Sequence, residues 1–201
     1  MTGRPVSVFS VVIPAYNVET VIGEQLASLA AQDFRGEWEV LVSDNGSTDA
    51  TVARVLEWCG RLPGLRLVDA SQRRGRSPAR NIGAAEARGD FLLFLDADDR
   101  ATPGWLSAMA EAAHDADVLG GAVVKFYPDG DGETYEDENP SRTPPGPVFR
   151  FLPFSRSCNF GVRADVFRLV GGFNEEYDQA EDVEICWKLQ LAGYELVYVP
   201  D

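Results

Sequence analysis

The sequence is poor in the residues that mark several common kinds of site. It has one histidine, His114, which excludes a zinc site built mainly from histidine. Its three cysteines, Cys59, Cys158 and Cys186, form no C-x-x-C pair, so we expect no disulfide framework and a reducing compartment. Basic residues number 18 against 32 acidic ones, a formal net charge of −14, which argues against binding to nucleic acid or to anionic membranes.

Long hydrophobic runs are also absent. No apolar run reaches the ~18 residues that a membrane-spanning helix needs, and no signal segment opens the chain. We therefore expect a cytoplasmic protein, peripheral at the inner membrane face if it meets a membrane at all. With 201 residues, 45% of them hydrophobic, the chain can bury a large core as a single domain.

The first half of the chain alternates short apolar runs with helical patterns. Strands are predicted at 6–14, 38–44, 65–70 and 90–99, and helices at 18–32, 47–60 and 77–89. This alternation predicts right-handed βαβ units and an α/β fold with a mostly parallel central sheet, covered by helices on both faces.

The second half is less regular. A helix is predicted at 102–114 and a strand at 117–126. Residues 127–147 then hold six acidic residues and little apolar material, which predicts a mobile acidic loop. This loop is either a solvated insertion or a lid on the acceptor side of a site.

Three carboxylates follow directly on the most hydrophobic short run, FLLFLDADDR. Asp96, Asp98 and Asp99 stand so close that they repel one another unless a positive group lies among them. Ligands of parallel sheets bind beyond the carboxyl ends of strands, where Asp44 and Asp69 also fall. Carboxylate oxygens suit Mg²⁺ or Mn²⁺. Taken alone, the stretch fits a divalent-cation site and equally a buried strand that ends in a solvated acidic turn.

Five motifs together resemble the family 2 glycosyltransferases of the GT-A fold, a three-layer α/β/α fold. In order, they are SVVIPAYN (10–17), VSDNGSTD (42–49), RSPARNIGAAEARGDFLLFLDADD (76–99), GGFNE (171–175) and AEDVEICWKLQLAG (180–193). The resemblance covers nearly the whole chain. It implies a metal-dependent, inverting single displacement that moves a sugar from a nucleotide-diphosphate sugar, with a UDP-sugar favoured, to an acceptor hydroxyl. The acceptor is a glycan, a lipid-linked molecule or a small molecule.

The resemblance also divides the single domain, 1–201, into a nucleotide-binding half at 1–100 and an acceptor and catalytic half at 101–201. By motif position it assigns nucleotide binding to Pro14, Ala15, Tyr16, Glu19, Asp44, Arg76, Asp96 and Ala97. Asp98 would ligate the metal, Mg²⁺ or Mn²⁺. For Asp44, an Asx turn or a cap is the alternative to a hydrogen bond with the nucleobase. Arg80 is expected either to serve the donor or to pair with an acid.

The pair Glu181-Asp182 carries the other half of the implied chemistry. The resemblance makes Asp182 the general base that deprotonates the acceptor, a role that contributes ~10²–10⁴-fold to a rate. It makes Glu181 and Asn159 acceptor-binding residues. The alternative interpretation of the acidic pair is a charged first turn of a solvated helix, because helix N-termini favour negative charge.

One departure from the family pattern keeps other functions open. Members of the family usually supply a histidine metal ligand beyond the strand that corresponds to YELVYVPD, whereas this sequence ends at Asp201. Either water replaces that ligand or C-terminal residues are missing. A non-catalytic, glycosyltransferase-like nucleotide-binding module is therefore the main alternative. A sugar-phosphate nucleotidyltransferase is less favoured, because PAYNVET replaces the Gly-rich, Arg-containing loop expected after its first strand.

Overall fold

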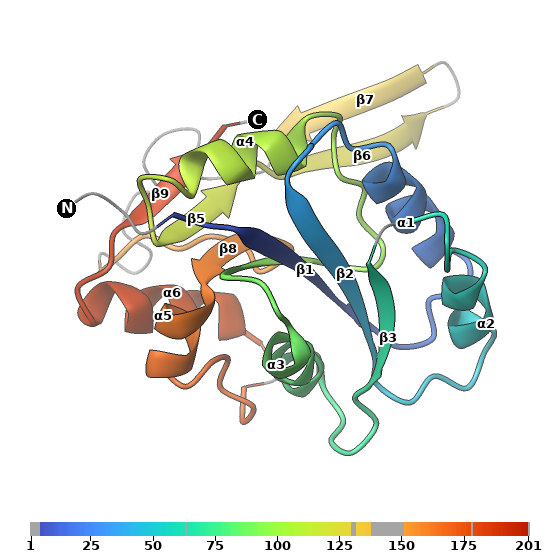
Figure 1. Cartoon of the computed structure of the whole chain (residues 1–201), viewed down its shortest axis with the longest axis horizontal. Helices are drawn as coiled ribbons and strands as arrows, with labels where there is room; N and C mark the ends of the chain where they lie inside the picture. The colour runs from blue at the N-terminus through green and yellow to red at the C-terminus, as the bar shows by residue number, and fades with distance from the viewer. Residues whose placement is uncertain (1–4, 63, 130–131, 138–150, 178, 201) are drawn as a thin grey trace.

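The computed structural model describes residues 5–62, 64–129, 132–137, 151–177 and 179–200 (Figure 1). The strands of the central sheet, in spatial order, are β3 (Leu65–Asp69), β2 (Glu37–Asp44), β1 (Val8–Ala15), β4 (Phe91–Leu95), β8 (Asn159–Arg163), β5 (Val118–Gly121) and β9 (Leu196–Val199). The helices are α1 (Ile22–Ala30), α2 (Thr51–Leu56), α3 (Arg76–Glu86), α4 (Trp105–Ala112), α5 (Ala164–Leu169) and α6 (Glu181–Leu191).

The sheet is mostly parallel, as the alternation of strands and helices predicted. Strands β1 to β4 all pair in parallel, and β9 pairs in parallel with β5. Strand β8 is the exception, because it runs antiparallel between β4 and β5. Its pairing with β4 sets Asn159 opposite Leu95 and Arg163 opposite Phe91. The start of β8 therefore lies at the acidic end of β4.

Helices cover both faces of the sheet (Figure 1). Alternate side chains of a strand point to opposite faces, so each face has its own core. Val11 and Ile13 of β1 belong to the core beneath α1 and α4, while Val12 belongs to the core beneath α3, α5 and α6. Within the described residues, no helix is both long and apolar enough to span a membrane.

Two predicted segments differ from the structure. The helix predicted at 47–60 begins only at Thr51, because carboxylate and amide side chains accept from the backbone N–H groups of Ser47, Thr48, Ala50 and Thr51. The strand predicted at 117–126 is two strands. The loop predicted at 127–147 is corrected in its first part, where β6 (Val124–Asp129) and β7 (Gly132–Asp137) pair as an antiparallel hairpin. Backbone hydrogen bonds define such a pair, and they leave no mark in an acid-rich composition. Residues 138–147 lie outside the described residues.

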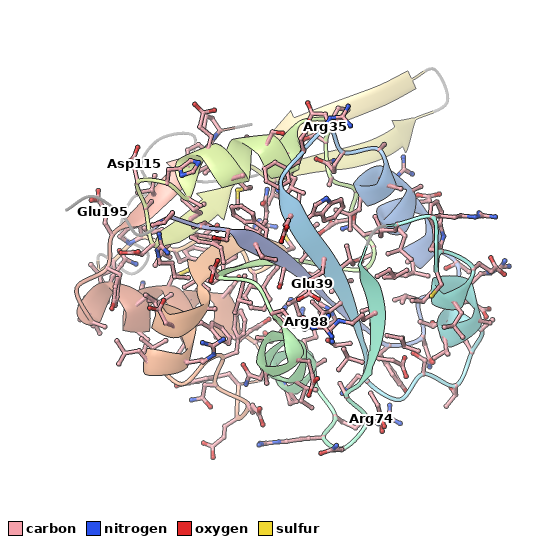
Figure 2. All side chains as sticks on the ribbon, viewed as in Figure 1. Arg35, Glu39, Arg74, Arg88, Asp115 and Glu195 are labelled. Atoms are coloured by element: carbon pink, nitrogen blue, oxygen red, sulfur yellow. The ribbon has the colours of Figure 1, made fainter. Side chains whose placement is uncertain are left out.

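A buried carboxylate anchors the end of the sheet opposite Asp44. The Oε1 atom of Glu39 accepts hydrogen bonds from Ser10 Oγ at 2.8 Å and the Arg88 N–H at 2.7 Å, and Arg66 Nη2 lies 2.9 Å from Oε2. Burial alone would raise the pKa of Glu39, but these hydrogen bonds outweigh it and lower the pKa. Figure 2 shows Glu39 and Arg88 between β2 and α3.

The close approach of α3 to the sheet yields a stability prediction. A Cβ on Gly83 would overlap Ser43 Oγ and lie 2.6 Å from Val12 Cγ1. Gly83→Ala should therefore lower the free energy of unfolding by about 1–3 kcal/mol, the usual cost of overpacking a core. Gly23→Ala in α1 is the matched control, because a Cβ there meets nothing within 4 Å. Removing a helical glycine should stabilise the protein by ~0.5–1 kcal/mol. Urea unfolding of both variants tests the pair, and the reverse order would contradict the close contact.

Candidate functional site

The carboxyl ends of three parallel strands meet at one edge of the sheet. In the strand register, Asp44 stands beside Ala15 on one side and beside Asp69 on the other. The structure therefore brings together Ala15, Asp44 and the adjacent Pro14, three of the predicted nucleotide-binding residues. Asp69 is bound locally, with its Oδ1 accepting from the Ser71 N–H at 2.9 Å.

Predicted nucleotide-binding acids also hold the loop between β2 and α2. Asp44 is buried, and its carboxylate accepts from the Ser47 N–H, three residues on, at 3.2 Å, the cap-like arrangement that was left open. Exposed Glu19 accepts from the Ala50 N–H at 2.7 Å. Both carboxylates therefore organise the loop backbone, whatever else they bind.

An aromatic surface borders this edge. Tyr16 is 47% exposed, and the Arg74 guanidinium lies 4.6 Å from its ring centroid. Figure 2 labels Arg74 on the loop between β3 and α3. Sequence reasoning named Tyr16 for nucleotide binding and left Arg74 without a role. Their contact places a guanidinium against an exposed aromatic ring beside this edge.

The acidic cluster at the end of β4 is a candidate metal centre. Ligand atoms of Asp96, Asp99 and Cys158 all lie within 4.8 Å of one another. Asp98, the predicted ligand, is exposed and does not belong to this group. Two carboxylates and a thiol are donors that a divalent cation accepts, so the residues present fit such an ion.

The electrostatics of the cluster favour a cation. Burial, together with the charges of Asp96 and Asp98, raises the pKa of Asp99 to about 7, and a hydrogen bond to Cys158 only partly opposes the shift. Burial likewise raises the pKa of the Cys158 thiol, and the carboxylates of Asp99 and Asp96 add to the shift. A positive ion among these groups would stabilise the ionised forms of Asp99 and Cys158, and so would lower both pKa values.

Sequence reasoning did not place Cys158 or Gln25 in this cluster. Cys158 reaches it because β8 pairs with β4, and no local pattern announces an antiparallel strand there. Gln25 is fully buried on α1, and its Nε2 donates to the backbone oxygen of Asp96 at 2.9 Å. A polar residue among the apolar positions of a helix is the signal that could have marked Gln25.

The predicted base lies at the start of α6. Asp182 is partly buried, and burial raises its pKa. The Glu181 charge adds to the shift, whereas the Val183 N–H and Arg80 oppose it. Ala180 precedes the helix with φ of 63°, a left-handed conformation that is uncommon for a residue other than glycine. The surrounding structure therefore holds the acidic pair in a defined place.

A buried arginine joins the two acidic groups. Arg80 Nη2 donates to Asp96 Oδ1 at 2.6 Å, and Arg80 Nη1 donates to Glu181 Oε1 at 3.1 Å. This confirms that Arg80 pairs with acids. Arg76 Nε lies 4.0 Å from the same Glu181 oxygen. Glu181 is 5% exposed, so its carboxylate faces arginines of α3.

Asn159 has internal partners for both its polar atoms. Its Oδ1 accepts from Trp105 Nε1 at 2.9 Å, and its Nδ2 donates to the Ala122 backbone oxygen at 2.6 Å. It is 7% exposed. These bonds tie β8 to α4 and to the chain after β5, and a role toward an acceptor stays a prediction. Ala97 is buried in the core beside the cluster.

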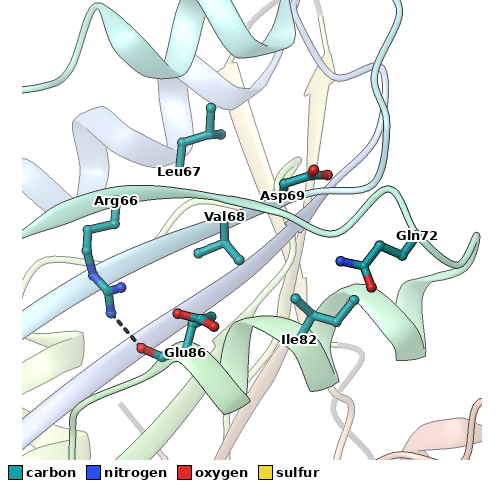
Figure 3. A pocket seen from close by; sticks show the side chains of 7 residues that line it. All are labelled: Arg66, Leu67, Val68, Asp69, Gln72, Ile82 and Glu86. Carbon is teal, nitrogen blue, oxygen red and sulfur yellow. Dashed lines mark hydrogen bonds between the residues drawn. The ribbon is translucent and has the colours of Figure 1, made fainter.

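Two cavities flank α3. One of about 200 Å³ is lined by residues at the start of α3 and by Glu175, Tyr177 and Glu181. The other, about 530 Å³, lies between β3 and α3 (Figure 3). It is lined by Arg66, Leu67, Val68, Asp69, Gln72, Ile82 and Glu86. Asp69 is the one of these seven that the sequence singled out, as an acid at a strand end; the other six were not predicted as site residues.

Comparison with known proteins gives consistent matches. The sequence model described as "Glycosyl transferase family 2" matches residues 10–171. Glycosyltransferase AglE of Haloferax volcanii is 29% identical over 96% of this chain and 64% of its own length. Pre-mycofactocin glycosyltransferase of Mycobacterium tuberculosis is 30% identical over 95% of this chain and 41% of its own length. The chain thus spans less than two thirds of these relatives.

Solved structures agree with these sequence matches. The S. aureus TarS 1-349 structure superposes with a TM-score of 0.74 at 30% identity, over 95% of this chain and 58% of that one. Mannosyltransferase PcManGT from Pyrobaculum calidifontis gives a TM-score of 0.78 at 23% identity, over 100% of this chain and 57% of that one. The second likeness bears on the fold alone. Together they confirm the predicted GT-A fold.

The raised pKa of Asp99 predicts a pH-dependent stability. The unfolded chain loses this proton near pH 3.8, whereas the folded protein keeps it up to about pH 7. The free energy of unfolding should therefore fall as the pH rises through this window and level off above it. Asp99→Asn should remove most of the decline, and the raised pKa of Asp182 should leave a smaller one. Urea unfolding with EDTA between pH 4 and 8 measures it.

Asp98→Asn is the control for this measurement. It removes one of the two charges that raise the pKa of Asp99, so the decline should shrink without disappearing. A wild-type pH dependence in Asp99→Asn would contradict the assignment.

Proposed function

The chain belongs to glycosyl transferase family 2, and we propose that it transfers a sugar from a nucleotide-diphosphate sugar to an acceptor hydroxyl. One observation carries the proposal: the acidic cluster at the end of β4 and the acidic pair at the start of α6 are bridged by Arg80. Such a transfer requires a site that binds the diphosphate of the donor and, close to it, a general base for the acceptor hydroxyl.

A UDP-sugar is the favoured donor. Structures of TarS at 29% and 28% identity are described as complexes with UDP and with UDP-GlcNAc, which supports this choice. In the proposal, Pro14, Ala15 and Tyr16 line the nucleoside and Asp44 accepts from the imide N–H of the base. Glu19, Arg76, Asp96 and Ala97 complete the nucleotide site. Residues 1–100 thus form the nucleotide half, and residues 101–201 form the acceptor and catalytic half.

The acidic cluster would hold a divalent cation, Mg²⁺ or Mn²⁺. Asp98 remains the proposed ligand, and Asp96, Asp99 and Cys158 supply the neighbouring donor atoms. When bound, the ion stabilises the negative charge that develops on the leaving diphosphate. The chain's own arginines, Arg74 and Arg76, lie at the start of α3 and add positive charge on the same side.

Asp182 is the proposed general base of an inverting single displacement. Its carboxylate takes the proton of the acceptor hydroxyl, whose oxygen bonds to the anomeric carbon while the bond from that carbon to the diphosphate oxygen breaks. A carboxylate whose pKa is raised by burial accepts a proton more readily, which supports the assignment. Glu181 and Asn159 are proposed to position the acceptor. No covalent enzyme intermediate is needed.

Nucleotide binding tests the donor half. We expect UDP to bind with Mn²⁺ more tightly than without it in isothermal titration, and Asp98→Ala to remove the Mn²⁺ dependence. Titrations with dTDP and GDP identify the base. Asp115→Asn, which changes an exposed acid after α4 (Figure 2), should bind as wild type. If no nucleotide binds in the presence of metal, the donor site is absent.

Turnover tests the catalytic half. UDP released from UDP-GlcNAc is measured with and without a panel of hydroxyl acceptors. Asp182→Asn should lower kcat by ~10²–10⁴-fold, the contribution of a general base, and leave UDP affinity unchanged. Nucleotide binding without acceptor-stimulated UDP release would instead favour a non-catalytic nucleotide-binding module.

A further inference from the structure

Arg80 has an unusual place for an arginine. Its side chain is fully buried, and its two terminal nitrogens bind carboxylates from segments 85 positions apart, Asp96 and Glu181. Within the described residues, its Nε has no hydrogen-bond partner. A buried charge is costly unless it is paired, and here the pairing involves two segments rather than one.

The segment before α6 is held by the same turn of α3. The Arg80 guanidinium lies 5.5 Å from the Phe173 ring centroid. Beside it, Asn81 Oδ1 accepts from the Phe173 N–H at 2.9 Å, and Asn81 Nδ2 donates to the Phe173 backbone oxygen at 2.8 Å. Two consecutive residues of α3 therefore fix the chain that leads into the acidic pair.

We propose that Arg80 is a positioning residue. It sets the separation between Asp96, on the nucleotide side of the site, and the start of α6, where Glu181 precedes the base Asp182. The inference rests on the proposed function. A guanidinium presents a planar fork that reaches two carboxylates at once, whereas a lysine ammonium is a single point charge. Because attack requires the reacting atoms in close alignment, a shift of ~1 Å between the halves can cost ~10²-fold in rate.

A purely structural role predicts different behaviour. Arg163 is the comparison, because it is buried and its Nε lies 2.8 Å from Asp117 Oδ1. It stands at the opposite end of β8, across from Phe91. If burial and pairing were all that mattered, Arg80→Lys and Arg163→Lys would lower the melting temperature alike and leave the kinetics unchanged.

The first experiment compares steady-state kinetics. We expect Arg80→Lys to lower kcat for UDP-GlcNAc by ~10–100-fold, the usual effect of losing a residue that orients a site. Donor KM should change far less. Arg163→Lys should retain the wild-type kcat. Equal kcat values in the two variants would overturn the inference.

A double-mutant cycle then asks whether Arg80 acts through Glu181. The variant Arg80→Lys/Glu181→Gln should be no slower than the slower single variant, because both changes break one contact. In the double variant Arg80→Lys/Arg163→Lys, the effects of the two single changes on kcat should instead add. Additive losses for Arg80 and Glu181 would show that the contact carries no coupling.

Hydrogen exchange separates failure of this inference from failure of the proposed function. In Arg80→Lys, amides at 173–186 should exchange faster than in wild type, while Arg163→Lys should leave them unchanged. This readout needs no turnover. If wild type binds no nucleotide and releases no UDP, the transferase proposal fails, and the exchange data still decide whether Arg80 holds the segment. Unchanged exchange would overturn the positioning role.

Discussion

The repulsion among carboxylates at the end of β4 is the constraint on which the rest of the site depends. Asp96, Asp98 and Asp99 follow directly on a strand that is buried on both faces, which keeps them close together. Arg80 offsets part of the charge from inside the protein. The pKa of Asp99, raised to about 7 by burial and by its two neighbours, indicates that this compensation is incomplete. The remaining charge is what a divalent cation would neutralise.

The same constraint explains why the site spans two halves of the chain. The positive group that meets Asp96 inside the protein is Arg80 of α3. Its other terminal nitrogen is paired with Glu181 at the start of α6. The donor acids and the acidic pair therefore share one counter-ion. This sharing ties the position of α6 to the position of the strand end, although the two segments make no sheet contact with each other. The link passes through a side chain that water does not reach.

Much of this could be predicted from the sequence. Alternating strands and helices indicated the parallel sheet, because each such unit is built from neighbouring residues, and the strand ends indicated where acids would gather. What could not be predicted involves distant partners. Arg80 and Glu181 are 101 positions apart, and Cys158 reaches Asp99 only because β8 runs antiparallel beside β4. The hairpin β6–β7 was missed because its pairing is made by the backbone, whereas its composition is that of a loop.

Charge, rather than cavity size, identifies the site. The larger cavity beside α3, about 530 Å³, is bordered by Arg66 and Glu86, which are hydrogen-bonded to each other through the Glu86 backbone oxygen. The smaller one, about 200 Å³, has Arg74 and Arg76 on one side and the carboxylate of Glu181 on the other. In a chain with a formal net charge of −14, these arginines give an anionic donor a local attraction. Arginines and a helix N-terminus coincide at the start of α3. Both attract negative charge, so this is where a diphosphate next to the acidic cluster would be stabilised.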